Sequence, residues 1–140
     1  MRYMLDTNIC IYLMRNQPPQ VARRFALLYR GDAVISAITL AELRFGAQVA
    51  TDPGREHAAV DGLLEDLPAL SFAVTACMSY AHLRAAVRDR RRDALDRLIA
   101  AHAIAERCTL VTNNVVDFRD YPGLVVENWL DDPAPLPPSD

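Results

Sequence analysis

The chain has 140 residues, a formal net charge of −3 and 51% hydrophobic residues. This length suits one domain with a real core, and no apolar stretch approaches the roughly 20 residues that a membrane span needs. The negative charge argues against a protein whose whole surface grips nucleic acid.

The predicted elements begin with a short buried strand at residues 2–6. Helices are expected at 9–15 and at about 19–30, and an apolar, β-branched strand at 33–38. Thr39 is a good N-cap for the next helix, and Glu42 three residues later completes a capping box.

The second half of the chain shows the same alternation of helices and strands. Thr75 and Asp93 are the predicted caps of two of its helices. The remaining elements are a helix at 55–66, a strand at 70–74, a helix at 76–90, a helix after residue 93, and strands at 109–112 and 124–127.

The predicted strands are continuous apolar runs separated by helices, which is typical of a parallel sheet buried on both faces. We therefore expect an α/β fold in which a parallel sheet is sandwiched between helices (α/β/α). It forms a single domain over residues 1–130, and the Pro-rich segment 131–140 is predicted to be a disordered tail.

Four acidic residues stand beside hydrophobic segments: Asp6, Glu42, Asp96 and Asp117. Each has a structural explanation as well, since they suit an N-cap, a capping box, the first turn of a helix and a loop, in that order. Carboxylates brought together repel one another unless cations neutralise them, and oxygen ligands suit Mg²⁺ or Mn²⁺. Sites in parallel sheets form beyond the carboxyl ends of the strands, so the functional interpretation of these acids is a metal site at that edge of the sheet.

All fifteen basic residues are arginine, and several gather between residues 84 and 97. This cluster suits contacts with phosphate groups. The candidates for contact with RNA are Arg88, Arg90, Arg91 and Arg92.

The histidines and cysteines carry no recognisable catalytic pattern. His57, His82 and His102 each fall on a predicted helix, where a structural histidine is the simpler interpretation. Cys10, Cys77 and Cys108 lie far apart in apolar contexts, which predicts buried thiols in the reducing cytoplasm.

Taken in order, the motifs resemble the PIN-domain ribonucleases of the VapC toxin type, from toxin–antitoxin pairs. The resemblance runs from about residue 3 to 130. The segments that carry it are Met4-Leu5-Asp6-Thr7-Asn8-Ile9, Ile35-Ser36-Ala37-Ile38-Thr39-Leu40-Ala41-Glu42-Leu43, Asp96-Arg97-Leu98-Ile99-Ala100-Ala101-His102-Ala103, Thr109-Leu110-Val111-Thr112-Asn113-Asn114, Phe118, Pro122-Gly123-Leu124 and Val126-Glu127-Asn128-Trp129.

The resemblance implies an endoribonuclease that depends on Mg²⁺ or Mn²⁺ and cuts structured RNA, such as a tRNA or an rRNA loop, with metal-activated water. Asp6, Glu42 and Asp96 match the three core acidic positions, and Asp117 matches a fourth, more variable one. Asn8, Thr112 and Asn113 match polar positions that line the pocket. The resemblance also implies a homodimer and inhibition by a cognate VapB-type antitoxin, whose C-terminal segment covers the site.

The chain departs from the family pattern just before the third acidic position. The family usually has a Gly-containing loop there, whereas this chain has Arg88-Asp89-Arg90-Arg91-Arg92-Asp93. Asp93 therefore remains an alternative to Asp96, and the number of metal ions, one or two, is open. Two other functions also remain: a binding module that has lost metal geometry, and a metal-dependent phosphatase or DNA nuclease.

Overall fold

The protein, described here by a computed structural model over residues 2–87 and 94–131, is built around a five-stranded sheet. The strand order is β3-β2-β1-β4-β5, and every neighbouring pair is parallel. The predicted parallel sheet is thus confirmed. Its strands are β1 (Tyr3–Leu5), β2 (Ala33–Ser36), β3 (Ala69–Leu70), β4 (Thr109–Val111) and β5 (Val126–Glu127).

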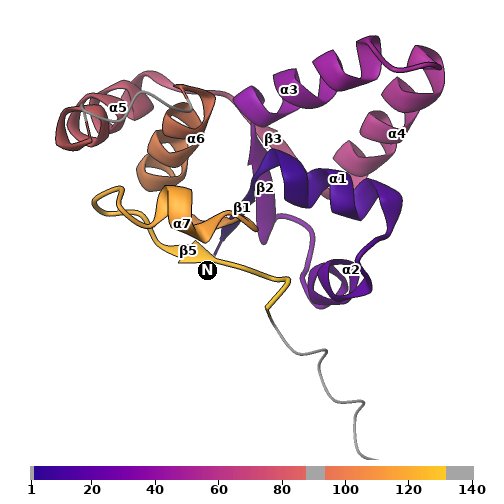
Figure 1. Cartoon of the computed structure of the whole chain (residues 1–140), viewed down its shortest axis with the longest axis horizontal. Helices are drawn as coiled ribbons and strands as arrows, with labels where there is room; N and C mark the ends of the chain where they lie inside the picture. The colour runs from indigo at the N-terminus through magenta and orange to yellow at the C-terminus, as the bar shows by residue number, and fades with distance from the viewer. Residues whose placement is uncertain (1, 88–93, 132–140) are drawn as a thin grey trace, which may run out of the picture.

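Helices lie on both sides of the sheet, so the predicted sandwich is also confirmed (Figure 1). One side carries α1 (Thr7–Arg15), α2 (Pro19–Ala26) and α4 (Pro53–Asp66), and the other carries α5 (Val74–Ala86), α6 (Ala94–Ala105) and α7 (Val115–Phe118). Helix α3 (Ala37–Gln48) leaves the carboxyl end of β2 and packs against both α4 and α6. None of the described helices is both long and apolar enough to cross a membrane.

Each central strand contributes to two separate cores because its side chains alternate between the faces of the sheet. On β1, Leu5 joins the core beneath α1, α2 and α4, whereas Met4 joins the core beneath α5 and α6. Val111 and Leu110 divide in the same way on β4. This double burial explains why the strands are continuous apolar runs in the sequence.

Helix α3 begins earlier than the sequence predicted. Its N-cap is Ser36, whose side chain accepts a hydrogen bond from the backbone N–H of Ile38 at 3.0 Å. Thr39 is therefore a fully buried residue inside the helix, and the predicted capping box with Glu42 is wrong. The reason is local: Ser36 satisfies an open donor of the first turn at the very end of β2, so the helix starts without a loop.

Other boundaries also differ from prediction. Helix α2 ends at Ala26, α5 begins at Val74 without a side-chain cap, and α7 was not predicted. Cys10 and Cys108 are buried as expected, but Cys77 is exposed on α5, so the prediction of a third buried thiol is wrong. The predicted cap Asp93 and the tail beyond residue 131 lie outside the described residues.

Candidate active site

Asp6 occupies the junction between β1 and α1. Its backbone N–H donates to the carbonyl of Val111 at 3.0 Å, which continues the pairing of β1 with β4. Its side chain caps α1 by accepting a hydrogen bond from the N–H of Ile9 at 3.0 Å. Asp6 is therefore the N-cap that the structural explanation proposed, and it is also held rigidly at the carboxyl edge of the sheet.

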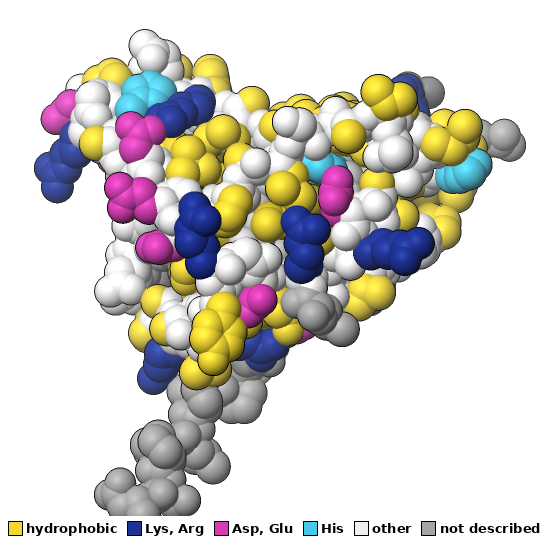
Figure 2. Space-filling view, turned by 180° about the vertical axis from the view of Figure 1, so that it is seen from behind, with side chains coloured by type: hydrophobic (Ala, Val, Ile, Leu, Met, Phe, Trp, Pro, Cys, Tyr) yellow, Lys and Arg dark blue, Asp and Glu magenta, His cyan; other side chains and the backbone are white. Residues whose placement is uncertain are grey.

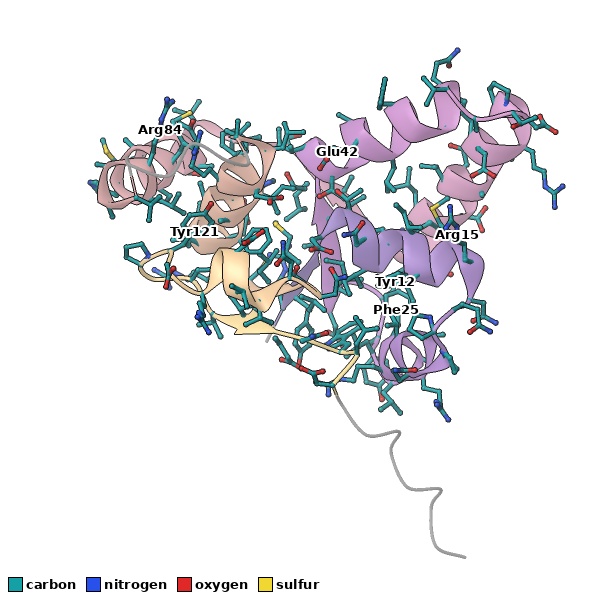
Figure 3. The ribbon with its side chains drawn as sticks, viewed as in Figure 1. Tyr12, Arg15, Phe25, Glu42, Arg84 and Tyr121 are labelled. Carbon is teal, nitrogen blue, oxygen red and sulfur yellow. The ribbon has the colours of Figure 1, made fainter. Side chains whose placement is uncertain are left out.

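Glu42 reaches the same edge from α3. The hydroxyl of Thr7 donates a hydrogen bond to Glu42 Oε1 at 2.8 Å, so the side chain points toward the start of α1 (Figure 3). Thr7 directly follows Asp6 in the chain, which brings the two carboxylates into one site. This contact was missed by sequence analysis; its only signal was a hydroxyl residue next to Asp6.

The environment of Asp6 opposes its ionisation. The pKa of Asp6 is raised from 3.8 to about 6, chiefly by burial and also by the charge of Glu42, while hydrogen bonds from Thr112 and the Ile9 N–H act in the opposite direction. Asp6 is only 7% exposed. A buried carboxylate beside another is a position where a cation would be stabilising.

The polar segment after β4 reaches Asp6 through one of its residues. Thr112 is fully buried, forms a side-chain hydrogen bond with Asp6 and accepts one from the N–H of Asn114 at 3.0 Å. Asn113 turns toward α1, where its amide donates to the hydroxyl of Tyr12 at 3.1 Å. Asn8 is exposed near the start of α1, and its backbone N–H also contacts Asp6.

The other two acidic candidates stand on the opposite side of the sheet. Asp96 is half-buried in the first turn of α6, a helix that packs against β2, β4 and α3. Asp117 lies in the first turn of α7, and its Oδ2 accepts a hydrogen bond from Asn114 Nδ2 at 2.6 Å. Asp117 is thus linked through Asn114 to Thr112, instead of lying in a solvated loop.

The donor set suits a hard divalent cation. Within residues 2–87 and 94–131, no three His, Cys, Asp or Glu side chains are gathered closely enough to hold a metal ion. Mg²⁺, however, keeps several waters and is usually held by one or two carboxylates. Asp6 and Glu42 provide such a pair. A cation bound between them would favour the ionised form of Asp6 and so lower its raised pKa.

The arginine cluster is only partly described. Arg88, Arg90, Arg91 and Arg92 lie outside the described residues, as does Asp93, the alternative third acid. Arg84 is exposed and packs over the ring of Tyr80, with its guanidinium carbon 5.8 Å from the ring centre. On the face shown in Figure 2, the described arginines are spread over the surface, some beside acidic side chains and others beside hydrophobic or polar ones.

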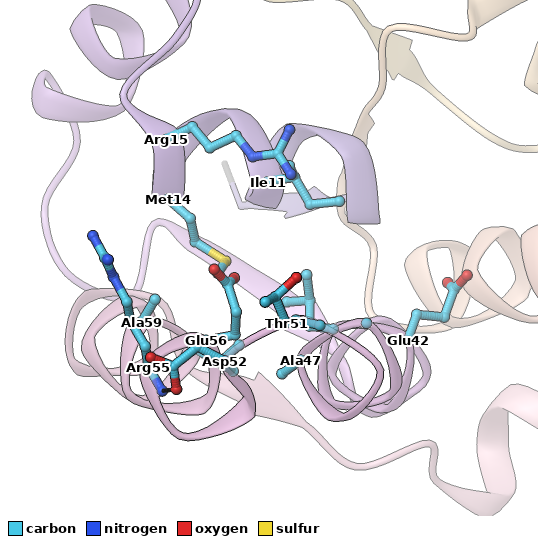
Figure 4. A pocket seen from close by; sticks show the side chains of 14 residues that line it. Ile11, Met14, Arg15, Glu42, Ala47, Thr51, Asp52, Arg55, Glu56 and Ala59 are labelled. Carbon is cyan, nitrogen blue, oxygen red and sulfur yellow. Dashed lines mark hydrogen bonds between the residues drawn. The ribbon is translucent and has the colours of Figure 1, made fainter.

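A groove of about 810 Å³ runs between α1, α3 and α4 and ends at Glu42 (Figure 4). Its lining is mostly small or apolar where the helices face one another, and its rim carries charges of both signs. The lining residues are Ile11, Met14, Arg15, Glu42, Leu43, Gly46, Ala47, Ala50, Thr51, Asp52, Arg55, Glu56, Ala59 and Val60.

Comparison with known proteins places this architecture in a family. The PIN domain model matches residues 3–124. Ribonuclease VapC2 of Rickettsia felis is 37% identical over 132 residues, covering 92% of this chain and 98% of that protein. The tRNA(fMet)-specific endonuclease VapC of Shigella flexneri is 35% identical over 131 residues, covering 92% of this chain and 98% of that protein.

Solved structures agree with the sequence comparison. VapBC2 from Rickettsia felis, bound to a DNA fragment from its promoter, contains a chain that matches with a TM-score of 0.86 and 36% identity, covering 92% of this chain and 99% of that one. DNA-bound VapBC from Salmonella typhimurium matches with a TM-score of 0.85 and 35% identity, covering 92% and 98%. The chain therefore belongs to the PIN-domain family, and within it to the VapC type.

Proposed function

We propose that the protein is the toxin of a toxin–antitoxin pair and acts as a metal-dependent endoribonuclease on structured RNA. The observation that carries the proposal is the pairing of a desolvated Asp6 with Glu42 at the carboxyl edge of the sheet. The names of the relatives, which include ribonucleases and tRNA(fMet)-specific endonucleases, support RNA as the substrate and tRNA as one target. An rRNA loop is the other target that we propose.

In this proposal Asp6, Glu42 and Asp96 hold Mg²⁺ or Mn²⁺, and Asp117 assists from α7. When bound, such an ion activates water for attack at phosphorus and stabilises the charge that develops there. The protein's own contribution is to fix the ligands: Thr7 anchors Glu42, and Thr112 together with the Ile9 N–H orients Asp6. Asp6 binds the ion as an anion, so protons compete with the metal, and we expect metal affinity to weaken as the pH drops below about 6.

The first experiment incubates the purified protein with total bacterial RNA and Mg²⁺ or Mn²⁺, with and without EDTA, and maps the new 5′ ends. We expect a few discrete cuts that disappear with EDTA and in Asp96→Asn. Asp120→Asn is the matched control, because Asp120 is an exposed acid just beyond α7. Full cleavage by Asp96→Asn would overturn the assigned role of Asp96.

Titration with Mn²⁺ separates this proposal from a module that only binds RNA. Calorimetry should show binding that is lost in Asp6→Asn, whereas a protein with a ruined site would show none. Competition between RNA, DNA and a small phosphate ester tests the remaining alternative, a phosphatase or DNA nuclease. Preferential turnover of the ester or of DNA would favour that alternative.

We also propose a VapB-type antitoxin as partner, with a segment lying in the groove between α1, α3 and α4. The groove offers an apolar floor and ends at Glu42, so a basic side chain lying there would meet the Glu42 carboxylate. The related chains solved as VapBC assemblies support such a partner. A homodimer is likewise proposed, and the exposed apolar side chains of Phe45 on α3 and Met78 on α5 supply surface for it.

A further inference from the structure

A buried histidine joins the two helices that carry Glu42 and Asp96. His102 on α6 is fully buried, and its Nδ1 lies 2.7 Å from the hydroxyl oxygen of Ser36, which is also fully buried. Among the described residues, Ser36 is the side chain that hydrogen-bonds this ring. A short polar contact between two side chains in a dry core is costly to break, because both groups would lose their partner.

Ser36 connects this contact to the candidate site. It ends β2 and caps α3, so its oxygen fixes the first turn of the helix on which Glu42 sits. The register that pairs Met4 with Val34 places Ser36 level with Asp6, two residues further along each strand. The start of α3 is therefore set at the same edge of the sheet as Asp6.

His102 connects the contact to the third acidic residue. It lies in the same helix as Asp96, and residues 99–103 of that helix are all buried. The ring is further held by an edge contact with Phe72, with ring centres 5.3 Å apart. Burial lowers the pKa of His102, so the ring is neutral at physiological pH and fits a neutral hydroxyl partner.

We propose that His102 and Ser36 form a positioning pair that sets the placement of α3 relative to α6, and thereby of Glu42 relative to Asp96. The inference rests on the proposed metal-dependent function, since the geometry that it controls is the spacing of metal ligands. Neither residue touches the reacting atoms. The pair acts through the helix start that Ser36 caps and through the helix that bears His102.

The nature of the contact allows a discriminating test, because the hydrogen bond uses Nδ1. Asparagine carries a polar atom at the position of Nδ1, whereas the amide of glutamine lies one bond further out, near the position of Nε2. His102→Asn should therefore preserve the contact and His102→Gln should not, although both remove the ring. Ser36→Ala removes the same contact from the other side, together with the cap that the Ser36 oxygen provides for the Ile38 N–H.

The experiment measures Mn²⁺ affinity by calorimetry and the separate values of kcat and KM for the full chain and these three variants, with circular dichroism to confirm folding. We expect His102→Gln and Ser36→Ala to bind Mn²⁺ at least about tenfold more weakly, because substitutions of residues that orient metal ligands commonly have effects of this size. His102→Asn should bind Mn²⁺ about as tightly as the unaltered protein. The losses should appear in kcat with little change in KM. In the double variant His102→Gln/Ser36→Ala, the loss of Mn²⁺ affinity should be smaller than the product of the losses in the two single variants, because both remove the same contact.

The outcomes are distinguishable. Unaltered Mn²⁺ affinity in folded His102→Gln and Ser36→Ala would overturn the inference alone, as would equal losses in His102→Asn and His102→Gln. Failure of the unaltered protein to bind Mn²⁺ would overturn the proposed function and this inference with it. If His102→Gln does not fold, unaltered Mn²⁺ affinity in Ser36→Ala still overturns the inference, because that variant loses the His102 contact while the ring stays in the core.

Discussion

The two roles assigned to Asp6, helix cap and candidate metal ligand, both favour its ionised form, whereas its burial opposes ionisation. As an N-cap it accepts a hydrogen bond from the Ile9 N–H, and as a candidate metal ligand it must be ionised, yet burial favours its protonated form. Because the folded-state pKa of about 6 exceeds the ordinary 3.8, the folded protein binds the Asp6 proton more tightly than the unfolded chain does. The stability contributed by Asp6 is therefore greatest below about pH 4 and is lost as the pH rises through 6.

This pH dependence of stability predicts the effect of Asp6→Asn. The amide is uncharged at every pH and can still cap α1, so the variant should be more stable than the unaltered protein at pH 8 and nearly equal to it at pH 4. A shift from 3.8 to about 6 corresponds to an upper limit of about 3 kcal/mol. Urea denaturation at the two pH values without divalent ions measures it, and activity should be lost.

The matched control is Asp120→Asn, which replaces an exposed acid and should change stability little at either pH. Destabilisation by Asp6→Asn at pH 8 would contradict the assignment of Asp6 as a desolvated carboxylate. Addition of Mg²⁺ should stabilise the unaltered protein and leave Asp6→Asn unaffected.

At this scale, the sequence marked Asp6 and Glu42 as candidates and the family resemblance added Thr112; in the structure both Glu42 and Thr112 act on Asp6. Their proximity follows from the ends of neighbouring strands and from the helix that follows β2. The partnership of Ser36 with His102 could not be predicted, because it joins residues 66 positions apart through a core contact that no local pattern marks.

Among the elements, α3 and α4 form a hairpin whose polar link is centred on Arg44. Its guanidinium donates to His57 Nδ1 at 3.1 Å, to the His57 carbonyl at 3.3 Å and to Asp61 Oδ1 at 2.5 Å. These contacts hold the two helices that form walls of the groove.

We expect Arg44→Ala to destabilise the protein more than Asp61→Ala. The Asp61 pair is well exposed, so its loss should cost less than about 1 kcal/mol, whereas Arg44→Ala also removes the contacts with His57. Urea denaturation of both variants gives the comparison. Equal costs would mean that the ion pair, and not the His57 contacts, joins the helices.

Element types were predictable from sequence, but element starts were less so. The continuous apolar runs identified β1, β2 and β4, because strands buried on both faces of a sheet carry apolar residues at every position. The cap of α3 was misplaced because Ser36 and Thr39 are both good caps, and only the end of β2 decides between them. Helix α7, with four residues, is too short for its periodicity to be detected.

At the scale of the whole molecule, Trp129 packs the C-terminal end of the described chain against the N-terminal half. The ring is fully buried, meets Tyr3 edge-on with centres 5.6 Å apart, and lies beneath the guanidinium of Arg24, which also pairs with Glu127 at 2.8 Å. These contacts join β5, β1 and α2 in one cluster.

Trp129→Ala should therefore reduce the free energy of unfolding by about 3–5 kcal/mol, the usual cost of removing a large buried side chain. Val125→Ala is the control, because Val125 is 62% exposed and its truncation should change stability by less than about 0.5 kcal/mol. Thermal and urea denaturation measure both. A change of less than about 1 kcal/mol in the free energy of unfolding of Trp129→Ala would show that the core is stable without this side chain.

The β1–β4 pairing has a further consequence. Asp6 and Glu42 belong to the part of the chain before the exposed Ser71, and Asp96 and Asp117 belong to the part after it, while β1 and β4 are the strands where these parts meet. In the proposed site, neither half of the polypeptide contains all four acids, so we expect each half to be inactive by itself. During synthesis of the chain, the proposed nuclease activity is then expected to appear only after β4 has docked on β1.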